Sequence, residues 1–257
     1  MSPRRPPRAW IGPVKPVDPE ELIGPRGLVE EVLRGDDGEL PEDSGETAFF
    51  WSLLTPARKA RILSVIDARL ASVTAVLDHL ADPHNVAAIL RTAEGLGLAR
   101  AHIVPLDSAD DGHAHRRVTQ DAQKWIDVER HDSGAACAAE LKERGFEVWA
   151  GHLDDSSRLY TELPADRPIA LLFGNEHEGP QPETLAACAG TFRIPMAGFT
   201  QSFNVSVAAG MALAAVTRAR RAHLGAAGDL PEEGRVELRH RFTLLAAKLA
   251  RRMKNRR

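Results

Sequence analysis

Short apolar runs alternate with segments of helical periodicity along most of the chain. Runs rich in β-branched and other apolar residues predict strands at Val73–Leu80, His102–Leu106, Glu147–Leu153, Pro168–Phe173 and Phe192–Met196. Apolar positions that recur every three to four residues predict helices at Val86–Leu96, Gly134–Arg144, Gln181–Ala189 and Ser202–Ala222. Strands that alternate with helices are typical of a mostly parallel sheet with helices on both faces. The sequence therefore predicts an α/β fold whose ligands bind at the carboxyl ends of strands.

The pattern changes at both ends of the chain. Residues 1–48 hold eight of the 17 prolines and eleven acidic residues with little apolar periodicity, which predicts an extended or disordered leader. Helical periodicity starts near Phe49, and Thr55-Pro56 suits a helix N-terminus. A glycine-rich break at Gly225–Gly234 precedes a basic final helix. We therefore expect three parts: a leader (1–48), an α/β domain with a leading helix (49–224) and a C-terminal extension (225–257).

Composition narrows the class of protein. Apolar residues make up 43% of the 257 and charged residues 27%, a soluble globular composition that excludes wholesale disorder. The sequence has no uncharged apolar run of about 18 residues, so we expect no membrane span. Its two cysteines, Cys137 and Cys188, are too few for a disulfide scaffold or a cysteine-rich zinc site. Both are expected to be inert buried thiols, and the expected compartment is the cytoplasm.

A net charge of −3 conceals an uneven distribution of charge. Residues 235–257 carry nine basic side chains and one acidic side chain. A basic end on an acidic body favours a polyanionic partner such as nucleic acid. The alternative is a solvated helix that happens to be rich in lysine and arginine.

The first candidate segment is Asp82–Glu94. Pro83 and Asn85 are predicted to end a strand and cap the following helix. Arg91 lies off the apolar stripe of that helix, where its guanidinium could face the strand ends and bind phosphate oxygens in pairs. The alternative is a surface arginine paired with Glu94 or another acid.

The second candidate segment is Leu171–Pro180, an apolar strand that runs into a loop bounded by glycines. Gly174 and Gly179 permit a positive φ and a close approach of backbone to a ligand. Glu176 and Glu178 are two carboxylates, but acids two residues apart in one short loop do not straddle a sugar as a glycosidase pair does.

The third candidate segment is Arg193–Ala208, a short strand, a glycine-containing loop and a helix start with Ser202 as the expected N-cap. Ser202, Asn204 and Ser206 are polar where an ordinary core helix would be apolar, and small residues follow them. The alternative is a capped helix with a packing role only.

Other motifs lack the neighbouring elements or residues that their proposed sites require. Gly95-Leu96-Gly97 ends a helix instead of following a strand, so a dinucleotide site of the Rossmann type is not expected. His113 and His115 lack further ligands at a recognisable spacing. We therefore expect no metal.

In this order and at these separations, the three segments resemble the motifs of the TrmH family of SPOUT-class RNA methyltransferases. The resemblance covers about residues 55–250. It implies an SPOUT-type α/β fold with a deep trefoil knot, a homodimer, and S-adenosylmethionine as cofactor. It also implies 2′-O-methylation of a ribose in tRNA, most closely at guanosine 18 of the D-loop. The alternatives are an rRNA 2′-O-ribose methyltransferase of the same class and a non-catalytic knotted RNA-binding protein.

The resemblance also implies roles for particular residues. Arg91 matches the catalytic arginine of the family, and its supporting polar residues match Asn85, Glu176, Ser202 and Asn204. Positions lining the cofactor pocket match Gly151, Gly174, Ile194 and Phe203, of which Phe203 replaces the usual leucine. The residues expected to contact RNA are Arg58, Arg61, His84, Arg218, Arg220, Arg251 and Arg252.

Overall fold

The computed structural model describes residues 45–106 and 124–254, which belong to two units. Val65–Arg235 form one unit, and the other contains the described residues of 45–64 and 236–254. None of the described helices combines the length and the apolar character needed to cross a bilayer.

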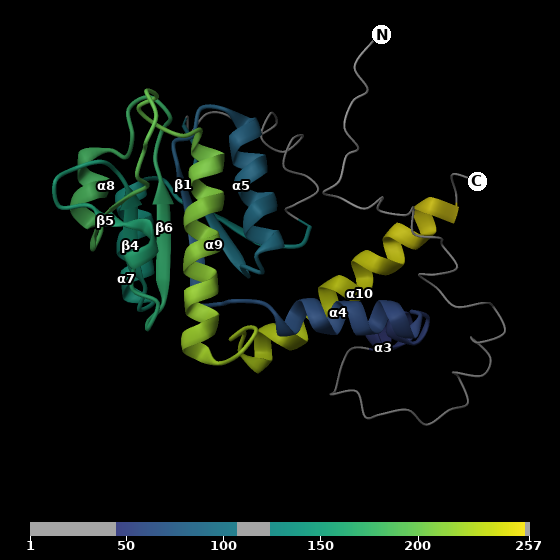
Figure 1. The fold of residues 1–257 in the computed structure, drawn as a ribbon. Coiled ribbons are helices and arrows are strands. Elements are labelled where there is room, and N and C mark those ends of the chain that lie inside the picture. Colours follow the sequence, from purple (N-terminus) through teal and green to yellow (C-terminus); the bar gives the residue numbers. More distant parts are fainter. Residues whose placement is uncertain (1–44, 107–123, 255–257) are drawn as a thin grey trace, which may run out of the picture. The chain divides into compact units, whose positions relative to one another are not determined.

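One parallel sheet of seven strands forms the centre of the Val65–Arg235 unit, in the order β3-β2-β1-β6-β4-β7-β5. Figure 1 shows β1 and β6, which pair with each other in this sheet. The strands are β1 (Val73–Asp78), β2 (Arg100–Val104), β3 (Asp127–Arg130), β4 (Glu147–Gly151), β5 (Arg158–Leu159), β6 (Ile169–Phe173) and β7 (Gly190–Arg193). Every residue of the neighbouring strands β1 and β6 is buried. Such continuous apolar runs are typical of parallel strands covered on both faces.

Helices cover the two faces of the sheet, each with its own core. The helices of this unit are α5 (Pro83–Gly95), α7 (Gly134–Glu143), α8 (Pro182–Ala187) and α9 (Val205–Leu224), with a 3₁₀ turn η1 (Tyr160–Glu162). Ala75 and Leu77 of β1 share a core with buried residues of α5 and α9. Val76, which points to the opposite face, packs with Cys137 of α7 and partly buried Leu185 of α8.

The second unit is helical. It contains α3 (Gly45–Ser52), most of α4 (Pro56–Asp67) and most of α10 (Glu232–Lys254). Thr47 of α3 forms a hydrogen bond with His240 of α10, and Thr47 is buried. The apolar side chains buried in this unit are Leu54, Ile62, Leu238, Phe242 and Ala246.

The α/β prediction is confirmed, with all five predicted strands and all four predicted helices present at slightly shifted ends. Two strands were not predicted. β3 and β5 leave no apolar run in the sequence, because no residue of either strand is fully buried. The strand order alone does not test the trefoil knot, which stays a prediction.

The units do not follow the expected boundaries at residues 48/49 and 224/225. Helix α3 already begins at Gly45, inside the predicted leader, while residues 1–44 lie outside the described part of the chain. The glycine-rich break belongs to the sheet unit as far as Arg235. Asp229 ties it there, because its carboxylate accepts hydrogen bonds from the N–H groups of Ala71 (2.6 Å) and Ser72 (3.3 Å).

Candidate active site

A cavity of about 900 Å³ opens where β4, β6 and β7 end and α9 begins. Its lining includes seven of the predicted residues: Gly151, Gly174, Glu176, Ile194, Ser202, Phe203 and Asn204. The carboxyl ends of parallel strands lie at one edge of a sheet, which is why segments far apart in the sequence meet there. The three candidate segments thus converge, although Asn85 and Arg91 of the first do not line the cavity itself.

Two glycines, Gly151 and Gly174, line the cavity. A Cβ on Gly174 would lie 2.2 Å from the backbone nitrogen of Pro180, closer than atoms can approach. The loop returns to this point because Gly179 has a φ of +70°, a conformation that favours glycine. A Cβ on Gly151 would lie 3.3 Å from the ring of Phe192, a tight contact. Backbone groups therefore face the cavity at both positions.

A chain of hydrogen bonds joins all three candidate segments. The side-chain amide of Asn85 donates to Glu176 Oε1 (2.8 Å), and that of Asn204 donates to Asn85 Oδ1 (3.1 Å). Glu176 also accepts from the backbone N–H groups of Ala81 (2.9 Å) and Asp82 (3.3 Å). These bonds fix the three loops relative to one another.

The carboxylate of Glu176 is stabilised in its charged form. Partial burial acts in the opposite direction, but hydrogen bonds from Asn85 and from the backbone outweigh it and lower the pKa of Glu176 below 4.5. Both carboxylate oxygens accept hydrogen bonds, which favours the ionised form. Glu176 is therefore suited to orienting the loops as an anion.

Replacing Glu176 with glutamine should change how stability depends on pH. A carboxylate with a lowered pKa stabilises the folded state above its unfolded pKa and loses this effect as the pH falls through the folded pKa. The free-energy gap between wild type and Glu176→Gln should thus be largest at neutral pH and shrink below about pH 4.5. Thermal melts over a pH series measure this gap. Glu178→Gln, at an exposed neighbouring carboxylate, is the control, and a gap that persists unchanged in acid would contradict the assignment.

Arg91 is exposed on α5. Glu94, the expected alternative partner, instead forms an ion pair with buried Arg69 at 2.9 Å. Within the described ranges Arg91 has no hydrogen-bond or ion-pair partner. The paired-arginine alternative is therefore not supported, and the side chain remains available to a ligand.

The predicted N-terminus at Thr55-Pro56 is confirmed, because α4 begins at Pro56 and Thr55 Oγ1 accepts from the N–H of Arg58 (3.3 Å). The predicted caps of α5 and α9 were wrong in position. Asp82 caps α5, with its carboxylate accepting from the N–H of His84 (2.8 Å). Asn85 is instead turned inward to Glu176. Asn204 caps α9 by accepting from the N–H of Ser206 (2.9 Å), which leaves Ser202 in the exposed loop before the helix.

The residues expected to contact RNA occupy different environments. Arg61, His84 and Arg218 are exposed, and Arg58 is half-buried. Burial, and then repulsion from Arg61, lowers the pKa of Arg58. Arg251 and Arg252 fall within α10, but their side chains lie outside the described part of the structure.

The prediction that Arg220 contacts RNA is wrong, because its side chain is buried. Its guanidinium donates to Ser72 Oγ (2.8 Å) and to the carbonyl of Ala165 (3.1 Å), and it lies 3.8 Å from Asp229 Oδ2. Arg220 therefore holds the segment after α9 against the start of β1. Its role is structural.

Arg220→Ala should destabilise the protein by about 2–3 kcal/mol, because buried acceptors and a carboxylate lose their partner. Arg218→Ala removes the same charge from an exposed position two residues away and should change stability by less than about 0.5 kcal/mol. Denaturant unfolding of both variants measures the difference. Equal losses in the two variants would contradict a structural role for Arg220.

Several residues of the cavity wall were not predicted individually as site residues. His152 and Leu153 follow β4, and Met196, Thr200 and Gln201 lie within the third candidate segment, before α9. Each comes within a few residues of a predicted strand end, the one signal that points to them. Leu159 of β5 could not be found in this way, because a two-residue strand leaves no pattern.

Comparison with known proteins agrees with this geometry. Residues 72–214 match the SpoU rRNA Methylase family. The chain is 37% identical over 172 residues to the tRNA (guanosine(18)-2′-O)-methyltransferase of Thermus thermophilus, covering 65% of this chain and 84% of that protein.

Two solved structures are also similar. The A. aeolicus TrmH/SpoU tRNA modifying enzyme has a TM-score of 0.65 at 28% identity, covering 73% of this chain and 95% of that one. The AdoMet-bound rRNA methyltransferase from Sinorhizobium meliloti has a TM-score of 0.52 at 27% identity, covering 61% and 59%. With more than half of its residues matched by the family pattern, the chain belongs to the SpoU methylase family.

Proposed function

We propose that this protein transfers a methyl group from S-adenosylmethionine to a ribose 2′-hydroxyl of tRNA, at guanosine 18 of the D-loop. The observation that carries the proposal is the meeting of three family motifs at one cavity, where Asn85, Glu176 and Asn204 form a continuous hydrogen-bonded chain. The substrate follows from the names of the T. thermophilus and A. aeolicus relatives. A tRNA substrate supports a cytoplasmic location for the protein.

The cavity fits the proposed cofactor. Its volume of about 900 Å³ lies in the range of small-molecule sites. The apolar side chains of Leu153, Leu159 and Met196 suit an adenine ring. Gly151 and Gly174 contribute backbone groups to the lining, which can bind the polar edge of that ring. When bound, S-adenosylmethionine supplies an activated methyl group on a sulfonium.

The protein must then align the ribose hydroxyl and stabilise the charge that develops on its oxygen. The fork of Arg91 suits a phosphate and the developing alkoxide. Arginine has a pKa above about 12, so Arg91 acts as an electrostatic stabiliser and not as the base. Asn85, Ser202 and Asn204 position the hydroxyl and Arg91, and Glu176 holds the loops.

We also propose that two copies of the chain associate, as the resemblance implies. Arg91 does not line the cavity of its own chain, whereas apolar Phe199, Phe203 and Val207 are exposed at the loop and first turn of α9. A second copy that covers this surface can bring another Arg91 to the cavity. Light scattering should give about twice the chain mass of 28.0 kDa, and a mass of one chain would contradict the pairing.

Labelled cofactor tests the substrate class. Total tRNA and total rRNA, each from cells lacking this enzyme, are incubated with the protein and S-adenosylmethionine carrying a labelled methyl group. Label should enter tRNA and not rRNA. Label in rRNA alone would favour the rRNA alternative, and label in neither would favour a non-catalytic RNA-binding protein.

Exposed arginines should set the salt dependence of tRNA binding. Arg61→Glu with Arg218→Glu should weaken binding and reduce the slope of log K against log salt by about 0.7–0.9 per lost phosphate contact. Arg130→Glu changes charge at another exposed arginine, at the end of β3, and is the control. Filter binding over a salt series measures the slope. Equal slopes for wild type, the double variant and Arg130→Glu would contradict RNA contact by Arg61 and Arg218.

A further inference from the structure

Two histidines and a cysteine gather between the sheet and α7, on the strands farthest from the cavity-forming β7 in the sheet order. His102 lies on β2, His131 directly follows β3, and Cys137 lies in α7. His102 and Cys137 are buried, and His131 is half-buried. One nitrogen of each histidine and the sulfur of Cys137 all lie within 4.8 Å of one another.

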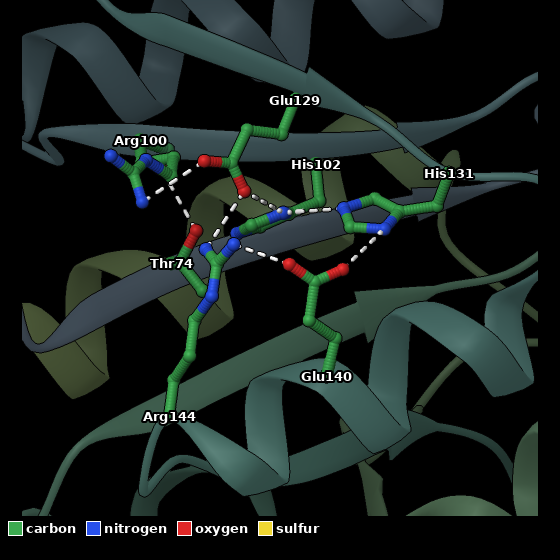
Figure 2. Close-up of polar contacts among 7 residues, drawn as sticks. All are labelled: Thr74, Arg100, His102, Glu129, His131, Glu140 and Arg144. Carbon is green, nitrogen blue, oxygen red and sulfur yellow. Dashed lines mark hydrogen bonds and ion pairs between the residues drawn. The ribbon is translucent and has the colours of Figure 1, made fainter.

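The two imidazoles are joined by a hydrogen bond. His102 Nδ1 and His131 Nε2 are 2.9 Å apart (Figure 2), a distance that one shared proton explains. Imidazole nitrogen is a common donor to zinc.

A carboxylate orients His131. Glu140 Oε2 lies 3.3 Å from His131 Nδ1, so the proton of this ring belongs on Nδ1 and its Nε2 lone pair points toward His102. A histidine whose second nitrogen donates to a carboxylate is the usual arrangement around protein-bound zinc. Cys137 adds a sulfur donor to the two imidazole nitrogens.

A carboxylate oxygen lies beside these two nitrogen donors and one sulfur donor. Glu129 Oε2 is 3.4 Å from His102 Nδ1. Its carboxylate is also held by Arg100 (3.0 Å) and Arg144 (2.9 Å), as Figure 2 shows. The charges of Glu129 and Glu140 balance those of the two arginines. A bound Zn²⁺ would add two positive charges, and ionisation of the Cys137 thiol would offset one of them.

We propose that His102, His131 and Cys137 form a zinc site, with Glu129 as the fourth donor. Zinc takes tetrahedral sets of nitrogen, sulfur and oxygen at about 2.0–2.3 Å, so the donors must close by roughly 1 Å. On binding, a Zn–S bond would replace the S–H bond of Cys137, whose proton passes to solvent, and the proton shared by the imidazoles would move to Nε2 of His102. The ion would join β2, the end of β3 and α7.

The sequence does not predict this site, because its two histidines are 29 positions apart. No recognisable zinc motif has that spacing. The proposal is independent of the methyl-transfer reaction, because none of these residues lines the cavity.

Zinc titration of the full-length protein tests the proposal. Protein stripped with a chelator should take up one Zn²⁺ per chain and melt at a higher temperature with zinc than without it. Co²⁺ should give the charge-transfer and visible bands of a thiolate-bound tetrahedral ion. Cys137→Ser and His131→Gln should each weaken zinc binding by at least about 100-fold and remove the rise in melting temperature.

Cys188→Ser and His223→Ala change the same residue types outside the cluster and should bind zinc as wild type does. Melting of all variants without metal shows that they fold. Absence of stoichiometric uptake by the wild-type chain would overturn the proposal. So would equal uptake by wild type, Cys137→Ser and His131→Gln.

Discussion

Arg91→Ala should lower kcat of methyl transfer by at least about 100- to 1,000-fold, the usual cost of losing a donor aimed at a developing oxyanion. Binding of S-adenosylmethionine should stay within about twofold of wild type, because Arg91 is assigned to the phosphate and the ribose oxygen of the RNA and not to the cofactor. Arg91 is exposed and unpaired within the described ranges, so its removal leaves no buried group without a partner. Single-turnover assays and calorimetry separate the two effects.

Two further variants sharpen this test. Arg91→Lys keeps the charge but loses the planar fork, so it should recover only part of the activity. Arg130→Ala, at an exposed arginine on β3, should leave the rate unchanged. Full activity in Arg91→Ala would remove this residue from the mechanism.

Gly174→Val should weaken cofactor binding and lower kcat/KM by about 100-fold or more, since displacements near 1 Å have effects of that size. Even the Cβ alone would lie 2.2 Å from the backbone nitrogen of Pro180. The loop from Gly174 to Gly179 must therefore move, and Glu176 moves with it. Calorimetric titration with S-adenosylmethionine measures the loss.

Gly95→Val is the matched control, because a Cβ at Gly95 meets no atom within 4 Å. This variant should bind the cofactor like wild type, with at most a small change in stability. Circular dichroism melts establish that both variants are folded. Unchanged cofactor affinity in folded Gly174→Val would contradict the assigned position of the cofactor.

The order of strands and helices could be predicted because burial dictates it. β1 and β6 are buried along their whole length, so their apolar runs stand out in the sequence. β5 has only two residues, and β3 has only four. All six are partly buried or exposed, so neither strand leaves an apolar run in the sequence. Pairing with a neighbouring strand, and not local pattern, defines these strands.

The candidate site was predictable in outline for a different reason. Polar and glycine-rich segments after strands must meet at one edge of a parallel sheet, which brings Gly174 and Asn204 to one cavity. The direction of each side chain could not be foreseen. Arg220 turns inward because Asp229 and Ser72 lie beneath it, and Ser72 is 148 positions away in the sequence. Asn85 turns to Glu176 for the same kind of reason, and Asp82 takes over its expected cap.

Mass spectrometry of one defined tRNA tests the central claim most directly. Two versions of the same tRNA, with guanosine or 2′-deoxyguanosine at position 18, are incubated with the protein and S-adenosylmethionine and then digested. The guanosine version should gain one methyl group, on the ribose of nucleotide 18, and the deoxy version should gain none. A methyl group on the deoxy version, on a base, or only at another nucleotide would contradict ribose methylation at position 18.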